Sequence, residues 1–575
     1  MKAVMLMFDT LTRRHLAPYG GDARTPRFSQ LAQESVQFDN FYVGSMPCMP
    51  ARRELHTGRY NFLHRSWGPL EPFDFSAIQA LRQAGVHTHL VTDHKHYWRD
   101  GGATYHTRYS TFEFIRGQEG DHWQGAVAQP DIQWQGMEDE ATRRRRRGRM
   151  AQDKINRAAM PTQADHCLHR TIGAGLAFLE ANHQQDQWFL QIECFDPHEP
   201  FFVAEPYLAQ YGCTPEEFDG WVPYYCDAPG GVSEEKVRKF YQALVTQCDD
   251  YLGRVVDKLK ALGLWEETLF IVCTDHGFLL GEHQWWGKNI MPVYDEIAHT
   301  PFFIRDPRCP QQGVRRQALA QTIDIPATLL EFFGVPRPAT MTGQPLRPAI
   351  EQDARLRDHA LFGYFGGHLN ITDGEGVYMR CPREPGASNL YEYTLMPTRI
   401  DSPFAPHELR EMRLHPGFNF TQGAQVLQIP ATFRYLDPWR FGDKLYDLRS
   451  DPEQRQPLDD PARALAYAQA MIPLMKAHDA PPELYVRFGL SPLTAALEQA
   501  FAARRAALPD AEHPGVAQAW LRVAAALEEQ GTPPPALAAG QRLTEQEIFT
   551  LIDAHFSGDR RRALIYQSRL LLRTA

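Results

Sequence analysis

This sequence has little cysteine for its length and no arrangement of cysteines that would serve a structural purpose. Nine cysteines are scattered from Cys48 to Cys381, an odd number without a C-x-x-C pair. A disulfide framework needs paired cysteines and a zinc site needs close spacing, so neither is indicated. We therefore expect most of these thiols to be small buried hydrophobic side chains.

Long hydrophobic runs and a net positive charge are also missing. No apolar run approaches the ~18 residues that a membrane span needs, so we expect no membrane partner. The first apolar run ends at Asp9, too early for a secretory leader, which predicts a cytoplasmic protein. The 60 basic and 70 acidic residues give a formal charge of -10, so nucleic acid is not an expected partner and any anionic ligand must be held locally.

What the sequence does have is a series of short apolar runs, rich in Val, Ile and Phe, that alternate with helical patterns. The runs occupy residues 3–8, 88–92, 188–194, 268–273 and 301–304. Strands that alternate with helices predict an α/β fold with a mostly parallel central sheet and helices on both of its faces. The clearest helix is expected after Ser233, a favourable N-cap, and should end at Gly263.

The patterns change along the 575 residues, which are too many for one hydrophobic core. We expect a catalytic α/β domain over residues 1–370, a smaller α+β region over 371–480 and a helical C-terminal appendage over 481–575, interrupted by a proline-rich break at 532–537. The added helices favour self-association into a homo-oligomer. The Arg143 to Arg147 run lies in an expected insertion, and such runs are typical of solvated or disordered loops, more so than of sites for anionic polymers.

Polar residues follow four of the predicted strands directly. They are Asp9, the segment "DHKH" at 93–96, "DPH" at 196–198 and "TDHG" at 274–277. In open α/β sheets the active site lies beyond the carboxyl ends of the strands, so these side chains should meet in one crevice. A single Asp there could be a helix N-cap, but four such segments together indicate a divalent cation and an anionic substrate.

Three segments resemble motifs of the sulfatase family, which belongs to the alkaline phosphatase superfamily. "CMPAR", with Cys48, Pro50 and Arg52, followed by "ELHTGR", is similar to the C-x-P-x-R signature. "TDHGFLLGEHQWWGK" (274–288) resembles the second metal-binding segment and "KLYDLRSDPEQ" (444–454) the C-terminal strand region. The resemblance spans roughly residues 1–455, implies an alkaline-phosphatase-like fold, and leaves the tail after 480 without a counterpart.

The resemblance implies that a maturation enzyme converts Cys48 to formylglycine. One hydroxyl of the hydrated aldehyde would attack sulfur, and collapse of the resulting covalent hemiacetal sulfate would release sulfate. The same resemblance assigns Asp9, Asp275, His276 and the modified residue 48 as ligands of one divalent metal ion. Two carboxylates, an imidazole and a hydroxylate suit Ca²⁺ or Mn²⁺, and the nitrogen ligand moves some weight toward Mn²⁺.

Two departures from the common family pattern narrow the resemblance. Thr10 follows Asp9 where many members have a second aspartate. The single aspartate resembles the choline-sulfatase and phosphonate-monoester-hydrolase branches, which also carry only one there. His94 and His96 stand where common sulfatases have Lys-x-His. Because imidazoles titrate near neutral pH, either one could take the proton that triggers hemiacetal collapse, although each could equally be a structural hydrogen-bonding residue.

The remaining expected site residues bind anions or transfer protons. Arg52 supplies a permanent cation with fork geometry for oxyanions, near the N-terminus of a helix expected to begin near Ala51. By resemblance, His198 and Lys288 flank the ester oxygen, and either could protonate the leaving alkoxide. The adjoining aromatic residues are either pocket walls or core: Tyr97, Trp98, Trp285 and Trp286.

These patterns predict a sulfatase that hydrolyses a small sulfate monoester. A phosphonate monoester or phosphodiester hydrolase is the alternative, because the same groups would serve a tetrahedral phosphorus centre. A non-catalytic anion-binding relative, in which Cys48 remains a thiol, is the alternative from another class.

Overall fold

The central element is an eight-stranded, mostly parallel sheet with the strand order β12-β2-β11-β8-β1-β7-β5-β6. The computed structural model describes residues 1–132, 140–222, 233–431, 437–491, 493–506, 511, 514–538 and 541–573. The strands of this sheet are β1 (Lys2–Phe8), β2 (Val36–Phe38), β5 (His87–Thr92), β6 (Thr111–Phe114), β7 (Trp188–Cys194), β8 (Thr268–Thr274), β11 (Phe302–Arg305) and β12 (Val314–Arg316). The five predicted apolar runs all form strands, and β11 is antiparallel to β8.

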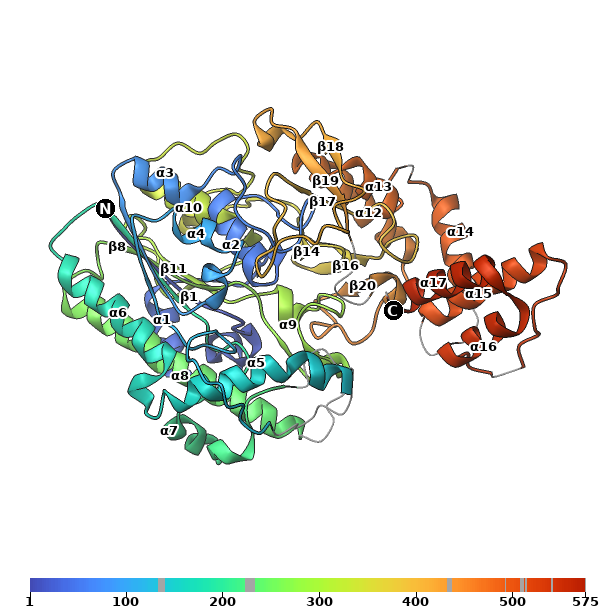
Figure 1. The fold of residues 1–575 in the computed structure, drawn as a ribbon. Coiled ribbons are helices and arrows are strands. Elements are labelled where there is room, and N and C mark those ends of the chain that lie inside the picture. Colours follow the sequence, from blue (N-terminus) through green and yellow to red (C-terminus); the bar gives the residue numbers. More distant parts are fainter. Residues whose placement is uncertain are drawn as a thin grey trace.

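Helices cover both faces of this sheet (Figure 1). They are α1 (Pro26–Glu34), α2 (Cys48–Thr57), α3 (Ala77–Gln83), α6 (Cys167–Asn182), α8 (Glu234–Ala261) and α10 (Asp324–Phe332). Side chains of β1 alternate between the faces: Val4 and Leu6 pack in the core with α1, α6 and α8. Met5 and Met7 pack in the core with α2, α3 and α10. The α/β fold predicted from the sequence is therefore confirmed.

Two helices bear on the sequence predictions. Helix α8 begins after Ser233, whose side chain accepts a hydrogen bond from the Lys236 amide, as expected. The arginine run does not form a loop: it lies in α5 (Glu140–Ala158), where buried Arg146 donates to the Val222 carbonyl at 2.9 Å. The loop expectation is wrong because arginine is a favourable helix residue, so helix propensity outweighs the repulsion between like charges in the run.

A second, five-stranded sheet has the order β20-β16-β15-β14-β4. Its strands are β4 (Ser45–Met46), β14 (Ala360–Tyr364), β15 (Leu369–Thr372), β16 (Gly376–Arg380) and β20 (Lys444–Asp447). Strand β4 comes from the segment just before α2, so this sheet fixes the chain that leads into Cys48. Strand β14 of this sheet begins at Ala360, ahead of the expected domain boundary at 370. That boundary remains a prediction.

The other described elements are short or lie in the C-terminal half. The strands are β3 (Phe41–Tyr42), β9 (Leu279–Leu280), β10 (Trp286–Gly287), β13 (Ala320–Gln321), β17 (Tyr391–Thr394), β18 (Arg413–His415) and β19 (Val426–Pro430). The helices are α4 (Ala103–His106), α7 (Glu205–Leu208), α9 (Asp295–Ala298), α11 (Arg347–Gln352), α12 (Pro461–Ala477), α13 (Pro482–Arg487), α14 (Ala495–Ala506), α15 (Pro514–Glu529), α16 (Glu545–His555) and α17 (Gly558–Arg573).

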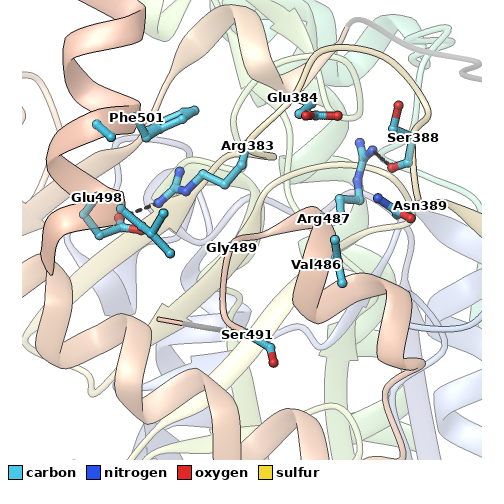
Figure 2. A pocket seen from close by; sticks show the side chains of 12 residues that line it. Arg383, Glu384, Ser388, Asn389, Val486, Arg487, Gly489, Ser491, Glu498 and Phe501 are labelled. Carbon is cyan, nitrogen blue, oxygen red and sulfur yellow. Dashed lines mark hydrogen bonds and ion pairs between the residues drawn. The ribbon is translucent and has the colours of Figure 1, made fainter. Parts of the chain in front are cut away.

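The tail is helical, as expected, and α15, α16 and α17 share a core of their own, which lies at one end of the molecule (Figure 1). Helix α14 connects this unit to the body: Glu498 accepts bidentate hydrogen bonds from buried Arg380 at 3.0 and 2.7 Å and a further one from Arg383. Figure 2 shows Glu498 and Phe501 on either side of Arg383, at a pocket of about 420 Å³. That pocket shares no residue with the strand-end segments predicted from the sequence.

Among the helices that the structure describes, none combines the length and the apolar character that crossing a bilayer requires.

Candidate active site

The ends of four parallel strands bring the predicted site residues together. Phe8 of β1 pairs with both Cys194 of β7 and Thr274 of β8, and Thr92 of β5 pairs with Glu193 of β7. Because the last residues of these parallel strands pair with one another, the segments that follow the strands all leave the sheet at the same edge. In open α/β sheets the active site lies at that edge. Asp9, His94, His198 and Asp275 all follow these ends, although Asp93 and Asp196 instead share the amide of Gln118.

Asp9, Cys48, Asp275 and His276 form a compact group of metal-ligating side chains. One ligand atom from each lies within 4.8 Å of all the others, and all four residues are buried. The Cys48 sulfur is 3.4 Å from His276 Nε2 and 3.9 Å from Asp9 Oδ1. Two ligands on opposite sides of a Ca²⁺ ion are about 5 Å apart, so one ion can reach all four side chains.

The charges around this group also fit a divalent cation. Arg52 is the positive group in direct contact with three buried carboxylates: those of Asp9, Asp275 and Glu193. Buried carboxylates in excess over cations are costly, so a bound dication would restore the balance. His276 presents a suitable ligand atom, because its Nδ1 lies 2.9 Å from the Gly277 carbonyl, which leaves Nε2 free to face the metal site.

Cys48 is the first residue of α2, and this corrects the expected helix start near Ala51. The difference arises because Pro47, and not a residue closer to Ala51, occupies the N-cap. Residue 48 therefore lies in the first turn, where unpaired amides and the positive end of the helix dipole favour an anion. Burial, reinforced by the charge of Asp9, raises the pKa of the Cys48 thiol well above its usual value, so the unmodified side chain is a poor nucleophile.

Arg52 lies one turn after Cys48 and is almost completely buried. Its Nε donates to Glu193 at 3.1 Å, its Nη2 donates to Asp9 at 2.8 Å, and its Nη1 donates to Asp275. Burial alone would raise the pKa of Asp9, but Arg52 and the His94 ring hold it well below its usual value. Asp9 is therefore ionised, and it is positioned by a guanidinium that a lysine could not replace geometrically.

The two histidines of "DHKH" have different surroundings. His94 Nε2 lies 3.1 Å from Asp9 Oδ2, so this ring touches the metal-ligand group. His96 is adjacent, with ring centroids 5.1 Å apart, but its Nδ1 faces Asp401 at 3.4 Å. Burial lowers the pKa of both rings, which favours neutral imidazoles able to accept a proton.

His198 lies in the segment after β7 and Lys288 directly follows β10, and both approach Glu199. The Glu199 Oε2 atom is 3.2 Å from His198 Nδ1 and 3.6 Å from Lys288 Nζ. Burial, together with the charge of Lys288, lowers the pKa of His198 to about 3. Although burial alone would lower the pKa of Lys288, Glu199 and other nearby anions raise it, so Lys288 holds a proton at neutral pH.

Sequence reasoning assigned no contacts in this site to Thr10, which it did single out, and it missed Glu193 and Glu199. Thr10 adopts a positive φ of 66°, donates to Asp9 Oδ1 at 2.6 Å and accepts from Lys288 at 3.0 Å. Glu193 accepts from Tyr97 at 2.8 Å as well as from Arg52, and Glu199 follows His198. The one available signal was Glu193, a carboxylate within an apolar strand that is buried along its whole length.

The aromatic residues near the motifs are core residues for the most part. Trp286 is fully buried in the larger core cluster, Trp285 packs in a separate cluster, and Tyr97 packs under β5 while its hydroxyl group serves Glu193. Trp98 packs beside the same cluster and donates to Asp121 at 2.8 Å.

The chain is similar to known sulfatases over much of its length. The family model described as Sulfatase matches residues 2–335. An arylsulfatase of Clostridium perfringens is 23% identical over 456 residues, which are 69% of this chain and 92% of that protein. An N-acetylglucosamine-6-O-sulfatase of Bacteroides thetaiotaomicron is 23% identical, over 63% of this chain and 74% of that protein. A multifunctional alkaline phosphatase superfamily protein of Trinickia caryophylli is 26% identical, over 57% and 72% respectively.

Solved structures share the fold. A phosphonate monoester hydrolase of Agrobacterium radiobacter superposes with a TM-score of 0.56 at 19% identity, over 83% of this chain and 96% of that one. A protein solved in complex with its substrate D-glucosamine-2-N,6-O-disulfate gives a TM-score of 0.55 at 16% identity, over 84% and 99%. At these identities the likeness concerns the fold alone.

Proposed function

Because this chain belongs to the sulfatase family and is a sulfuric ester hydrolase, we propose that it cleaves small sulfate monoesters with a formylglycine made from Cys48. The proposal includes a maturation enzyme that oxidises Cys48 and one divalent cation, Ca²⁺ or Mn²⁺, held by Asp9, residue 48, Asp275 and His276. When bound, the cation supplies charge that offsets the sulfuryl oxygens and lowers the pKa of an adjacent hydroxyl group.

The single observation that supports this function most strongly is the position of residue 48. It lies at the N-terminus of α2, inside the group of three other ligating side chains, one turn from Arg52. A structural thiol needs neither a cation site nor an arginine whose three donor directions are all taken by carboxylates. An anionic transition state at residue 48 benefits from both.

The proposed reaction has two halves. In the first, one hydroxyl group of the hydrated aldehyde would lose its proton to Asp9, a carboxylate that contacts residue 48. Its oxygen would form a bond to sulfur while the bond from sulfur to the ester oxygen breaks. The ester oxygen keeps the electron pair and takes a proton from Lys288 or His198. Lys288 is the stronger candidate, because it is charged at neutral pH whereas His198 is neutral.

In the second half, the remaining hydroxyl group of the hemiacetal sulfate loses its proton to His94, or to His96 through a rearrangement of its Asp401 contact. The carbonyl bond forms again, and the bond from carbon to the sulfate oxygen breaks with its electron pair on sulfate. Water then hydrates the aldehyde. His94 is better placed than His96, since it alone contacts Asp9.

A phosphonate monoester or phosphodiester hydrolase is a second proposal. Thr10 supports it: a neutral hydroxyl group stands where many sulfatases have a second aspartate, and in this position the chain resembles the phosphonate-monoester-hydrolase branch. One relative is named as a multifunctional alkaline phosphatase superfamily protein, which is a precedent for more than one function in one protein of this superfamily.

The test is side-by-side turnover of 4-nitrophenyl sulfate and a 4-nitrophenyl phosphonate by matured, metal-reconstituted enzyme. We expect the larger kcat/KM for the sulfate and no turnover of either by Cys48→Ala. A larger kcat/KM for the phosphonate would select the second proposal. No turnover of either ester, together with an unmodified Cys48 in protein from its own host, would favour the non-catalytic anion-binding relative.

A further inference from the structure

Glu199 is a buried carboxylate to which no described residue donates a hydrogen bond. Its exposed fraction is 1%, and within the described part of the chain neither Oε1 nor Oε2 accepts a hydrogen bond of normal geometry. A buried charged group without donors costs several kcal/mol. Folding alone gives no reason to keep such a group, since a neutral side chain of the same size would avoid that cost.

Its surroundings are the two proton-bearing groups proposed for the leaving oxygen. Glu199 Oε2 is 3.2 Å from His198 Nδ1 and 3.6 Å from Lys288 Nζ. The main-chain carbonyl of Glu199 also accepts from His198 Nδ1, so the ring is held from one side by a single residue. Lys288 has a second anchor at Thr10 Oγ1, 3.0 Å away, which leaves Glu199 as its charged contact on the other side.

We propose that Glu199 is a positioning residue that holds His198 and Lys288 for protonation of the leaving oxygen, and that this pair adapts the site to esters of poorly acidic alcohols. The inference rests on the proposed function. It follows from geometry: a carboxylate that contacts both His198 Nδ1 and Lys288 Nζ fixes where the other ring nitrogen and the remaining ammonium protons point.

Because Nδ1 of the neutral His198 donates its proton to the main-chain carbonyl of Glu199, the other ring nitrogen carries no proton and can only accept a hydrogen bond. Lys288 keeps a proton available beyond the two that point to Thr10 and Glu199. As the bond from sulfur to the ester oxygen breaks, the oxygen keeps the electron pair and this Lys288 proton moves to it. The need for that proton rises with the basicity of the leaving oxygen, so alkoxides gain more than activated phenolates.

The experiment measures how kcat/KM depends on the leaving group in matured wild type, Glu199→Gln and Glu199→Asp. The probes are 4-nitrophenyl sulfate, phenyl sulfate and a simple alkyl sulfate. Glu205→Gln is the matched control, because Glu205 is an exposed glutamate on the same connection after β7. Formylglycine content, bound metal and melting temperature are determined for each protein.

For Glu199→Gln we expect a loss below about tenfold on 4-nitrophenyl sulfate and a loss of ~10²-fold or more on the alkyl sulfate. Glu199→Asp should restore part of the alkyl activity, and Glu205→Gln should match wild type. Equal losses on all three esters would overturn the role of Glu199 while leaving the hydrolase function intact. A steep dependence on leaving-group acidity in the wild type would overturn it too, whether or not the variants fold. No turnover of any sulfate by matured wild type would instead refute the proposed function itself.

Discussion

Individual residues at this site depend on one another more than the motif suggests. Burial and the charge of Asp9 raise the pKa of the Cys48 thiol, so it stays protonated. Arg52 holds the neighbouring carboxylates in place, and Lys288 keeps its charge because anions surround it. Each side chain has a role only because the others set its protonation or position. Single substitutions therefore test specific steps and not a general loss of fold.

Cys48→Ser tests the need for two hydroxyl groups on one carbon. A serine hydroxyl group can attack sulfur, but its sulfate ester has no second hydroxyl group whose deprotonation would expel sulfate. We expect a burst of alcohol product equal to the enzyme present, followed by arrest, with a stable sulfate adduct on residue 48 in the mass spectrum. Sustained turnover by this variant would show that hemiacetal collapse is not required.

Arg52→Lys tests the three-way contact with Asp9, Asp275 and Glu193. A lysine ammonium cannot serve three carboxylates in one plane, so one or more of them would lose its donor. We expect metal affinity and kcat/KM to fall by ~10–100-fold, measured by metal titration and steady-state kinetics. Arg53→Lys is the matched control, since Arg53 pairs with Asp74 away from the ligands. Unchanged metal affinity in Arg52→Lys would contradict this role.

The sequence motifs were enough to predict that Asp9, Cys48, Asp275, His276 and Arg52 lie close together, because strand ends and a known spacing fix their positions. Their roles as metal ligands stay a prediction. The contacts of Glu193 and Glu199 could not be predicted. Their roles come from contacts with residues far along the chain, such as Arg52 and Lys288, and no local pattern specifies those contacts.

At the scale of elements, α2 and the strand before it determine where the nucleophile lies. Strand β4 pairs with β14, and α2 begins directly after Pro47, so residue 48 is fixed between the two sheets. The strands could be predicted from their apolar runs, whereas the first residue of α2 depends on the conformation that neighbouring segments impose. The helical arginine run agrees with the high helix propensity of arginine, which the expectation of a loop did not weigh.

Glu54 of α2 gives this element a pH dependence. Burial outweighs the hydrogen bonds from Ser45 and Thr322 and raises the pKa of Glu54 from 4.5 to about 7. A raised acid pKa means that the folded state holds the proton more tightly, so this contribution is present below about pH 4.5 and lost as the pH rises through 7. Glu54→Gln has no carboxyl group to titrate, so its folded state should not lose this stability as the pH rises.

We expect the stability of Glu54→Gln relative to wild type to rise between pH 5 and pH 8, by up to about 3 kcal/mol. Denaturation midpoints at the two pH values give the measurement, with exposed Glu205→Gln as the control. A difference between variant and wild type that stays constant across this range would contradict the assigned burial effect.

Over the whole molecule, the last three helices have a hydrophobic core of their own, although α15 also contacts the segment Pro438–Phe441. Leu484, Phe488 and Leu490 pack in the cluster that contains side chains of the five-stranded sheet, whereas the core of α15 to α17 begins at Val516. The composition of the tail predicted helices, but it could not show that its first part belongs to the body, because Leu and Phe have the same helical spacing in both settings.

Two truncations test this division. A chain that ends at residue 506 keeps α13, α14 and the Glu498 contacts, so it should retain the melting temperature of the catalytic body and the kcat/KM of the full chain. A chain that ends at residue 480 loses three core side chains and leaves buried Arg380 without Glu498, so it should be strongly destabilised. Equal behaviour of the two chains would contradict the boundary.

The conversion of Cys48 to an aldehyde is the central claim, and peptide mass spectrometry tests it most directly. The peptide that covers residues 45–59 is examined in protein matured in its own host and shown to hydrolyse a sulfate ester. The account predicts that residue 48 carries an aldehyde or its hydrate in the active fraction, in place of the thiol. An active preparation in which every copy of residue 48 is an unmodified cysteine would contradict it.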